Sequence, residues 1–271
     1  MFLTLLACTG ESPPATQGTL EVLSYNVHGL PEEITEDDTA ARIEQIAPLL
    51  AGYELIGLQE DWRAGDHAVL EAGTDHADKR WFDDEVESGR AYGSGLAVFL
   101  DLPVLDYEQV HYDTCSGVLE GASDCLASKG YQRVRVQLGA GELDVYNTHF
   151  EAGGGEEDDL ARAAQVELVL AALDRDSPDH AVLFMGDTNL NDDDPEDLVE
   201  VLKLKDYGLQ DSCEVLGCPE PGRIDRIMVL SRGGLTLTPE DWEVPPEFVD
   251  DAGVELSDHD PIHVGMSWSV D

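Results

Sequence analysis

Six short segments of this 271-residue chain place acidic, amide or imidazole side chains directly after apolar, strand-like stretches. Carboxylates and amides can hold a hard cation, and imidazoles can transfer protons near neutral pH. In chain order the candidate residues are Asn26, Glu60, His149, Asp187, Asn189, Asp225, Asp258 and His259. Each segment alone is weak evidence, because polar residues after a strand usually mark a turn or a solvated end. Their recurrence at strand ends, where a sheet is followed by surface loops, favours one shared site.

The elements that must position these residues are mainly strands. Strands are predicted over residues 20–27, 54–58, 95–100, 131–138, 143–149, 181–184, 224–230 and 262–268. A helix is predicted over residues 39–50, although Pro48 can kink it or end it early. Its apolar face comprises Ile43, Ile46, Ala47 and Leu50. Strands that outnumber helices, with short and long connections, predict a layered α/β sandwich with mixed sheets.

Two further helices are predicted in the second half of the chain. The first spans residues 158–175, with acidic residues at its start and Arg175 at its end, which matches the helix dipole. Its apolar face is expected to comprise Leu160, Ala164, Leu168 and Ala171. The second begins at Asp194-Pro195, a cap followed by proline in the first turn, and carries Leu198, Val201 and Leu202.

The composition excludes several classes of protein. Hydrophobic residues make up 42% of the chain and charged residues 27%, which excludes a disordered, collagen-like or coiled-coil chain. No apolar run approaches the ~20 residues that span a bilayer. With 58 acidic and 15 basic residues the formal net charge is −43, so a broad electrostatic footprint for nucleic acid is absent. Because salt screens long-range repulsion, a metal-loaded cleft could still accept a phosphate.

The N-terminus resembles a bacterial lipobox. Residues 5–8 read Leu-Leu-Ala-Cys, in which Cys8 would carry the lipid, and residues 9–19 read as a flexible tether. Residues 1–7 are short for a secretory apolar region and lack a positive charge, so either the true start lies upstream or the match is accidental. We expect residues 1–19 to be a signal remnant and tether, residues 20–271 to be one domain, and the protein to be exported, as a cell-envelope lipoprotein or in secreted form.

Four cysteines remain after Cys8, and they form two local pairs along the chain. These are Cys115 with Cys125 and Cys213 with Cys218, although sequence alone allows three connectivities. The alternative is four free thiols in a reducing compartment. Together with the lipobox, two local disulfides in an oxidising compartment are favoured.

The order of the six segments resembles the endonuclease/exonuclease/phosphatase superfamily. That superfamily includes pancreatic-type deoxyribonucleases, abasic-site endonucleases, inositol polyphosphate phosphatases and bacterial sphingomyelinases. The resemblance covers about residues 20–268, and its most specific pieces are residues 186–189 and 257–259 with the strand around Asp225 between them. It implies a four-layer α/β/β/α sandwich, two mixed β-sheets flanked by helices. It also implies Mg²⁺-dependent phosphoester hydrolysis, with Mn²⁺ or Ca²⁺ as alternative ions.

On this resemblance Glu60, Asn26 and Asp258 are the metal ligands. Glu60 suits the main ligand, because Mg²⁺ prefers carboxylate oxygen and a strand tip fixes the side chain. His259 matches the family's essential histidine, a general base or a phosphate-polarising group. Asp225 matches the carboxylate that holds the other nitrogen of that imidazole.

The other matches concern the phosphoryl group and the attacking water. His149 matches a second histidine that binds the phosphate or protonates the leaving group. Asp187 would orient the water, and Asn189 and Asn26 would contact phosphoryl oxygens. Either imidazole can serve as acid or base, so their division of labour stays open.

The remaining histidines lack the family context. His28 could line the cleft because it follows Asn26 closely. The others are expected on the surface or in satisfied packing: His67, His76, His111, His180 and His263.

Among the superfamily's members, bacterial sphingomyelinases are the most similar. The resemblance lies in residues 113–131, where Cys115 and Cys125 precede Lys129-Gly130, and in residues 147–152. It implies a phospholipid headgroup phosphodiesterase with a lipid substrate. The lipobox-like N-terminus would supply a lipid anchor at the membrane, and we expect a monomer. The haemolytic members carry an aromatic hairpin before their Ser-Asp-His, whereas residues 238–256 offer only Trp242 and Phe248 among seven acidic residues.

Two alternatives are kept. An extracellular deoxyribonuclease-like endonuclease could use the same core, although only 15 basic residues oppose the negative charge. A non-catalytic acidic surface lipoprotein that binds Ca²⁺ would be expected to have lost some of the six segments, and all six are intact.

Overall fold

Strands that are apolar on both sides need a covering layer on each face, and this chain builds two such sheets. Every residue of β2 (Leu55–Gln59) and β8 (Ala181–Asp187) is buried. The computed structural model describes residues 14–35, 37–82, 90–117, 124–218 and 222–271. The lipobox-like stretch with Cys8 lies outside these residues.

The first sheet has six strands, and β1 and β2 are its parallel pair. In spatial order they are β11 (Leu235–Glu243), β12 (Ile262–Val270), β1 (Gln17–Asn26), β2, β4 (Leu96–Leu100) and β3 (Asp78–Phe82). The second sheet also has six strands, with β7 and β8 parallel. Their order is β5 (Val104–His111), β6 (Gly130–Leu138), β7 (Gly141–His149), β8, β10 (Asp225–Leu230) and β9 (Gln210–Asp211).

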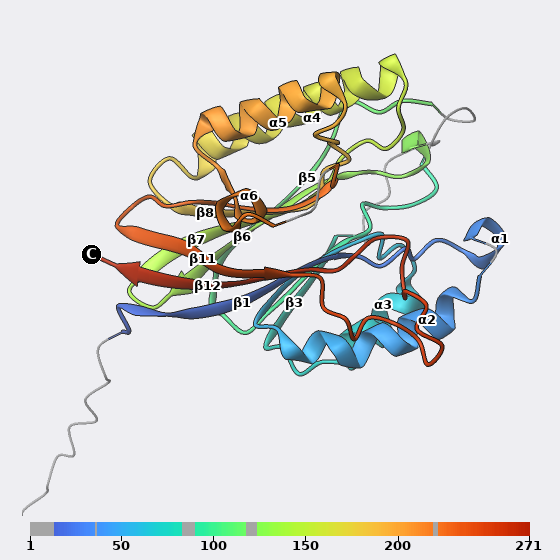
Figure 1. Cartoon of the computed structure of the whole chain (residues 1–271), viewed down its shortest axis with the longest axis horizontal. Helices are drawn as coiled ribbons and strands as arrows, with labels where there is room; N and C mark the ends of the chain where they lie inside the picture. The colour runs from blue at the N-terminus through green and yellow to red at the C-terminus, as the bar shows by residue number, and fades with distance from the viewer. Residues whose placement is uncertain (1–13, 36, 83–89, 118–123, 219–221) are drawn as a thin grey trace, which may run out of the picture.

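Helices cover the outer face of each sheet, as Figure 1 shows. The first sheet is covered by α2 (Thr39–Ile46), the 3₁₀ helix η1 (Ala47–Gly52) and α3 (Ala64–Ala72). The second is covered by α4 (Glu156–Asp176) and α5 (Pro195–Tyr207). Short elements complete the chain: α1 (Glu32–Thr35), the 3₁₀ helix η2 (Asp124–Leu126) and α6 (Ser212–Leu216). The predicted four-layer α/β/β/α sandwich is confirmed.

Three apolar layers hold the sandwich together. The central layer fills the space between the sheets and includes Val22, Val98, Val145, Leu183 and Val264. The outer layers seat the helices on the sheets, and they include Ile43 and Leu58 on one side and Val169 and Phe184 on the other. Burial of this kind contributes ~25 cal/mol per Å² of apolar surface, which makes these layers the main stabilising term.

The predicted apolar face of α4 is wrong by one position. Leu160 is 65% exposed, whereas Ala161, Val169 and Leu173 are buried. The cause is that this face also buries polar groups, which a pattern of apolar residues cannot register. Arg162 donates to Asp197 and to the carbonyl of Gly153. The same shift affects α5, where Leu198 and Leu202 are exposed and Val201 and Leu204 are buried.

Several boundaries and elements differ from the sequence prediction. Helix α2 ends at Ile46 and continues as η1, so Pro48 ends the α-helix early, as anticipated. Strand β1 begins at Gln17, because residues 17–19 of the predicted tether pair with β12. The elements α3, β3, β5 and β11 were not predicted. Charged residues interrupt these strands, and their burial patterns alternate or are partial because each lies at or near a sheet edge.

Both local cysteine pairs form disulfides, Cys115–Cys125 and Cys213–Cys218, and this confirms the favoured connectivity. Within the described ranges, no helix has the length and apolar character that a membrane crossing requires.

Candidate active site

The predicted site residues converge where the parallel strands of the two sheets end. Asn26 ends β1 in the first sheet, and Asp187 ends β8 in the second. The amide nitrogen of Asn26 donates to Glu60 Oε1 at 3.1 Å and to Asp187 Oδ2 at 3.0 Å. One buried amide therefore joins two carboxylates from opposite sheets, residues that are 34 and 161 positions away in the chain.

Behind this junction a second buried amide holds the sheets in register. Asn147 donates to the carbonyls of Leu58 and Ala97, each at 3.0 Å, and accepts from Gln59 at 2.7 Å. Because unsatisfied buried polar groups are costly, this network fixes how the strand ends meet.

Backbone strain is concentrated at the same place. Among the described residues, three other than glycine have positive φ: His28 at 49°, Glu60 at 59° and Asn189 at 50°. The left-handed conformation costs roughly 1–2 kcal/mol for such residues and is typically retained at functional sites. Each of the three follows a strand and lines the same pocket.

Asp187, Asp225 and His259 form a triad in which both aspartates are buried and the histidine is partly exposed. Nδ1 of His259 lies 2.8 Å from Asp225 Oδ2, and its Nε2 lies 3.7 Å from Asp187 Oδ2. Ser257 orients the loop by donating to the carbonyl of Asn26 at 2.7 Å and accepting from the backbone of His259 at 3.3 Å. Asp225 thus holds the Nδ1 side of the His259 ring, and Nε2 faces Asp187.

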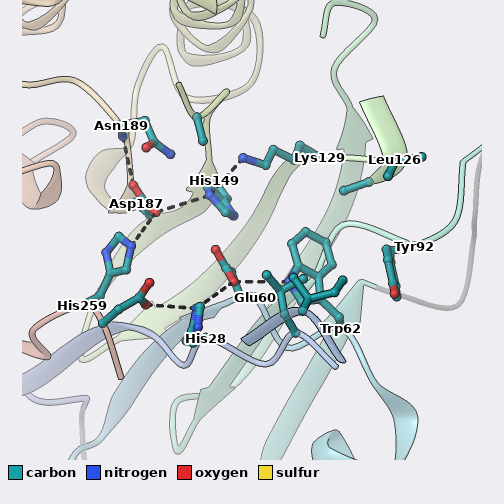
Figure 2. A pocket seen from close by; sticks show the side chains of 15 residues that line it. His28, Glu60, Trp62, Tyr92, Leu126, Lys129, His149, Asp187, Asn189 and His259 are labelled. Atoms are coloured by element: carbon teal, nitrogen blue, oxygen red, sulfur yellow. Dashed lines mark hydrogen bonds and ion pairs between the residues drawn. The ribbon is translucent and has the colours of Figure 1, made fainter. Parts of the chain in front are cut away.

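His149 faces Asp187 from another direction, and a lysine stands behind it. Nε2 of His149 lies 3.3 Å from Asp187 Oδ2 and 3.1 Å from Nζ of Lys129, which also donates to the carbonyl of Phe150. Figure 2 shows both imidazoles directed toward Asp187, with Lys129 reaching His149. With Lys129 donating to Nε2, the neutral ring carries its proton on Nδ1, and that buried atom makes no hydrogen bond within the described structure.

These residues form the polar floor of a pocket of about 530 Å³. Its opposite wall is apolar and aromatic, comprising Leu30, Ile34, Trp62, Tyr92, Leu126 and Ala127. The Trp62 and Tyr92 rings lie 6.1 Å apart, and Ile34 is 58% exposed at the rim. The pocket can therefore receive a ligand with one anionic and one apolar part.

Burial and mutual charge shift the ionisation of the floor. Burial raises the pKa of Glu60, and burial together with the Asp225 charge raises the pKa of Asp187 to about 6. Burial opposes the charged form of His259, but the hydrogen bond and charge of Asp225 outweigh it and raise its pKa to about 10. For His149, burial and the Lys129 charge hold the pKa well below the ordinary value. At neutral pH, His259 is charged and His149 is neutral.

The residues predicted to bind the metal differ in how deeply they are buried. Asp258 lies at the rim with a side chain that is 57% exposed, and His28 links it to Glu60, with Nδ1 3.1 Å from Asp258 and 3.8 Å from Glu60. Asn26 points its amide nitrogen at both carboxylates and accepts from the backbone of His28 through its oxygen. Asn189 lines the pocket while its amide donates to the carbonyl of Phe150.

Sequence reasoning did not assign Lys129 or Trp62 to the site. Lys129 stood within the sphingomyelinase-like stretch, so its presence in that motif was the available signal. Trp62 follows Glu60 by two residues and donates to it at 3.5 Å, and proximity to the carboxylate was its only signal.

The donor set fits a divalent cation. Ligand atoms of Glu60, His149 and Asp187 lie within 4.8 Å of one another, and so do those of Asp187, Asp225 and His259. Two buried carboxylates with raised pKa values repel each other, and a cation between them would offset that repulsion. Carboxylate and amide oxygens are what Mg²⁺ and Ca²⁺ prefer.

Comparison with known proteins agrees with this geometry. Residues 23–259 match the model of the Endonuclease/Exonuclease/phosphatase family. Because the match covers most of the chain, the protein belongs to that family.

Individual relatives are more distant. A sphingomyelinase from Mycobacterium bovis is 24% identical over 294 aligned positions, covering 99% of this chain and 57% of the relative. A mutant beta toxin from Staphylococcus aureus with bound magnesium ions has a TM-score of 0.68 at 18% identity, covering 91% of this chain and 99% of that one. TDP2 from D. rerio, complexed with a single-strand DNA product, has a TM-score of 0.67 at 19% identity, covering 92% and 98%. At such identities the structures establish the shared fold.

Proposed function

We propose that the protein is a metal-dependent phosphodiesterase that hydrolyses the headgroup ester of a phospholipid, as a sphingomyelinase does. The observation that carries the proposal is the two-sided pocket: a floor of carboxylates and imidazoles faces a wall of Leu30, Trp62 and Tyr92. The similarity to a mycobacterial sphingomyelinase supports the same substrate class. The polar floor suits a phosphoryl group, and the wall suits the apolar or quaternary-ammonium part of such a lipid.

The cation we propose is Mg²⁺, held chiefly by Glu60. Asn26 would contribute after turning its amide oxygen inward, and Asp258 would approach from the rim. A beta toxin of the same fold has bound magnesium ions, which supports this choice. When bound, Mg²⁺ supplies a Lewis acid that offsets negative charge on the phosphoryl oxygens.

The remaining residues would then divide the work according to their charge. Asp187, with a pKa of about 6, would orient the attacking water and accept its proton. His259 is charged at neutral pH and would donate a charge-assisted hydrogen bond to a phosphoryl oxygen, with Asp225 fixing the ring. His149 is neutral, and it and Asn189 would contact the phosphoryl group. The pKa values thus favour a donating role for His259 over that of general base.

A substrate panel tests the proposal. Purified protein is given Mg²⁺ with sphingomyelin, phosphatidylcholine, plasmid DNA or inositol phosphates, and phosphocholine release, nicking and phosphate release are measured. We expect phosphocholine release from the choline lipids, and an Asp187→Asn variant should abolish it. Nicking of plasmid DNA without lipid turnover would instead identify an endonuclease and contradict the lipid assignment.

We further infer that the protein is exported, lipid-anchored through Cys8 and monomeric. The two disulfides support an oxidising compartment. Expression in a bacterial host with radiolabelled palmitate should label the wild type and leave Cys8→Ser unlabelled. Label on both proteins, or on neither, would overturn the anchor.

A further inference from the structure

A second cluster of potential metal ligands lies on the outer face of the first sheet. Ligand atoms of Asp241, Glu243 and His263 lie within 4.8 Å of one another, and none of these residues lines the active-site pocket. Asp241 and Glu243 lie at the end of the edge strand β11, and His263 is the second residue of the neighbouring strand β12. The strands β11, β12 and β1 lie side by side (Figure 1).

Strand register places these side chains on one face. Glu243 is the direct cross-strand partner of His263, and Asp241 is the partner of Gly265. Glu21 of β1 is also a partner of Gly265, on its other side. Directly paired residues point to the same face of a sheet, so three carboxylates surround one imidazole. Gly265 supplies no side chain between them, and a Cβ there would lie 3.3 Å from Glu21.

The imidazole of His263 has one bonded and one unbonded nitrogen. His263 is only 9% exposed, and its Nε2 lies 2.7 Å from Glu21 Oε2. Its buried Nδ1 makes no hydrogen bond within the described structure, although it lies 3.2 Å from Glu243 Oε1. When Nε2 carries the proton and donates it to Glu21, the lone pair of Nδ1 faces the carboxylates of β11. A carboxylate on the far nitrogen is how proteins orient histidines that bind metals.

The charge of the cluster also favours a cation. In the described part of the chain, neither lysine nor arginine forms an ion pair with Glu21, Asp241 or Glu243. The ring of Tyr53 lies 5.3 Å from that of His263, and the charge of the cluster affects the pKa of the Tyr53 hydroxyl. Burial raises this pKa most, followed by the charges of Glu247, Glu243 and Glu21.

We propose that Asp241, Glu243 and Nδ1 of His263 bind a divalent transition-metal ion of the Zn²⁺ type, with Glu21 positioning the imidazole. One nitrogen and two carboxylate ligands, with a further position open to water, match the preferences of Zn²⁺ more closely than those of Mg²⁺. The ion would link the end of β11 to the start of β12, where the connection between the two strands leaves and re-enters the sheet. That connection, residues 244–261, carries Asp258 and His259 to the active site.

Zn²⁺ binding itself tests the site, without any measurement of turnover. Wild type, Asp241→Asn/Glu243→Gln and a control variant are equilibrated with Zn²⁺ while Mg²⁺ is kept in large excess. The bound Zn²⁺ is then counted by mass spectrometry after gel filtration. The control is Glu44→Gln/Asp206→Asn, which removes the same two charges from exposed positions on α2 and α5. We expect the ligand variant to bind one Zn²⁺ fewer than wild type and the control to bind the same number.

Two further readouts separate a built site from general attraction to an acidic surface. Imidazole ¹⁵N spectra should show the Nδ1 resonance of His263 shifting with Zn²⁺ in wild type and not in the ligand variant. Glu21→Gln should weaken Zn²⁺ binding about 10–100-fold, as loss of a positioning carboxylate does. Equal Zn²⁺ counts in wild type and ligand variant, an equal loss in the control, or an unshifted Nδ1 would overturn the proposal. Unchanged affinity in Glu21→Gln would overturn the role of Glu21.

Discussion

At the scale of single residues, the site is organised by opposite environments for two histidines. His259 is surrounded by three aspartates, whereas His149 has a lysine behind it. The same side chain is therefore charged in one position and neutral in the other at neutral pH. This division could not be predicted from the sequence, because it depends on which groups the fold brings near each ring.

The pKa of His259 provides the first prediction. Its pKa of about 10 lies above the ordinary value, so the ring should stay protonated from neutral pH until the pH rises through about 10. Asp225→Asn removes the hydrogen bond and charge and should lower this pKa, as an imidazole NMR titration without metal would show. The same variant should reduce turnover by about 10²–10⁴-fold, the range for a disabled proton-transfer or donor group. An unchanged titration curve in the variant would refute the assigned cause.

Lys129 provides the second prediction, which concerns the pKa of His149. Its charge is one of the causes that lower the pKa of His149, so Lys129→Met should raise that pKa, and kcat/KM should fall by about 10²–10³-fold. Lys129→Arg keeps the charge and should retain the low pKa of His149. If Lys129→Met titrated like wild type, the charge of Lys129 would not govern the state of this ring.

The aromatic wall of the pocket provides the third prediction, which concerns recognition of the lipid headgroup. Tyr92→Ala should raise KM for a choline lipid by about 2–30-fold, the range of a cation–π contact, and leave hydrolysis of bis-p-nitrophenyl phosphate near the wild-type rate. Exposed Val254 offers a matched truncation outside the pocket, Val254→Ala, which should alter neither. Equal effects of Tyr92→Ala on both substrates would remove Tyr92 from headgroup recognition.

At the scale of elements, the sequence predicted strands well where both faces are apolar and predicted helix faces poorly where polar groups are buried. Strand β8 is a continuous apolar run, and its prediction failed only at its end, where residues 185–187 extend it into the site. Helix α4 was placed correctly but rotated, because Arg162 and Gln165 occupy its buried face. Their partners, including Asp197 and Glu151, lie in other parts of the chain.

The rotation of α4 makes a matched pair of substitutions informative. Leu173→Ala removes a fully buried side chain and should cost about 2–5 kcal/mol of unfolding free energy. Leu160→Ala, on the exposed face, should change it by no more than about 0.5 kcal/mol. Urea denaturation of both variants measures the difference. A larger loss of unfolding free energy in Leu160→Ala than in Leu173→Ala would mean that the apolar pattern had predicted the buried face of α4 correctly.

At the scale of the whole molecule, the family and architecture were accessible from sequence because six segments keep a recognisable order. What stayed inaccessible was the pocket's apolar wall, whose residues lie in loops and short helices between the strands, such as α1 and η2. The net charge of −43 is a global property that the sequence does state.

That charge predicts a salt response. Self-repulsion destabilises a compact state, and ions screen it over about 8–10 Å at physiological strength. The melting temperature should therefore rise as NaCl increases from low to physiological concentration, by differential scanning calorimetry. A parallel series in sucrose at the same osmolality controls for stabilisation by solutes that are excluded from the protein surface. A melting temperature that fell with salt would show that attractive surface pairs outweigh the excess of like charge.

The convergence of Glu60, Asp187 and His259 around a divalent ion is tested most directly by bis-p-nitrophenyl phosphate hydrolysis through a cycle of EDTA and restored Mg²⁺. Wild type and the exposed-site control Glu44→Gln should lose turnover with the chelator and regain it with Mg²⁺, and Glu60→Gln should remain inactive throughout. Turnover that persists in EDTA, or a Glu60→Gln variant as fast as wild type, would contradict a metal-dependent centre at these strand ends.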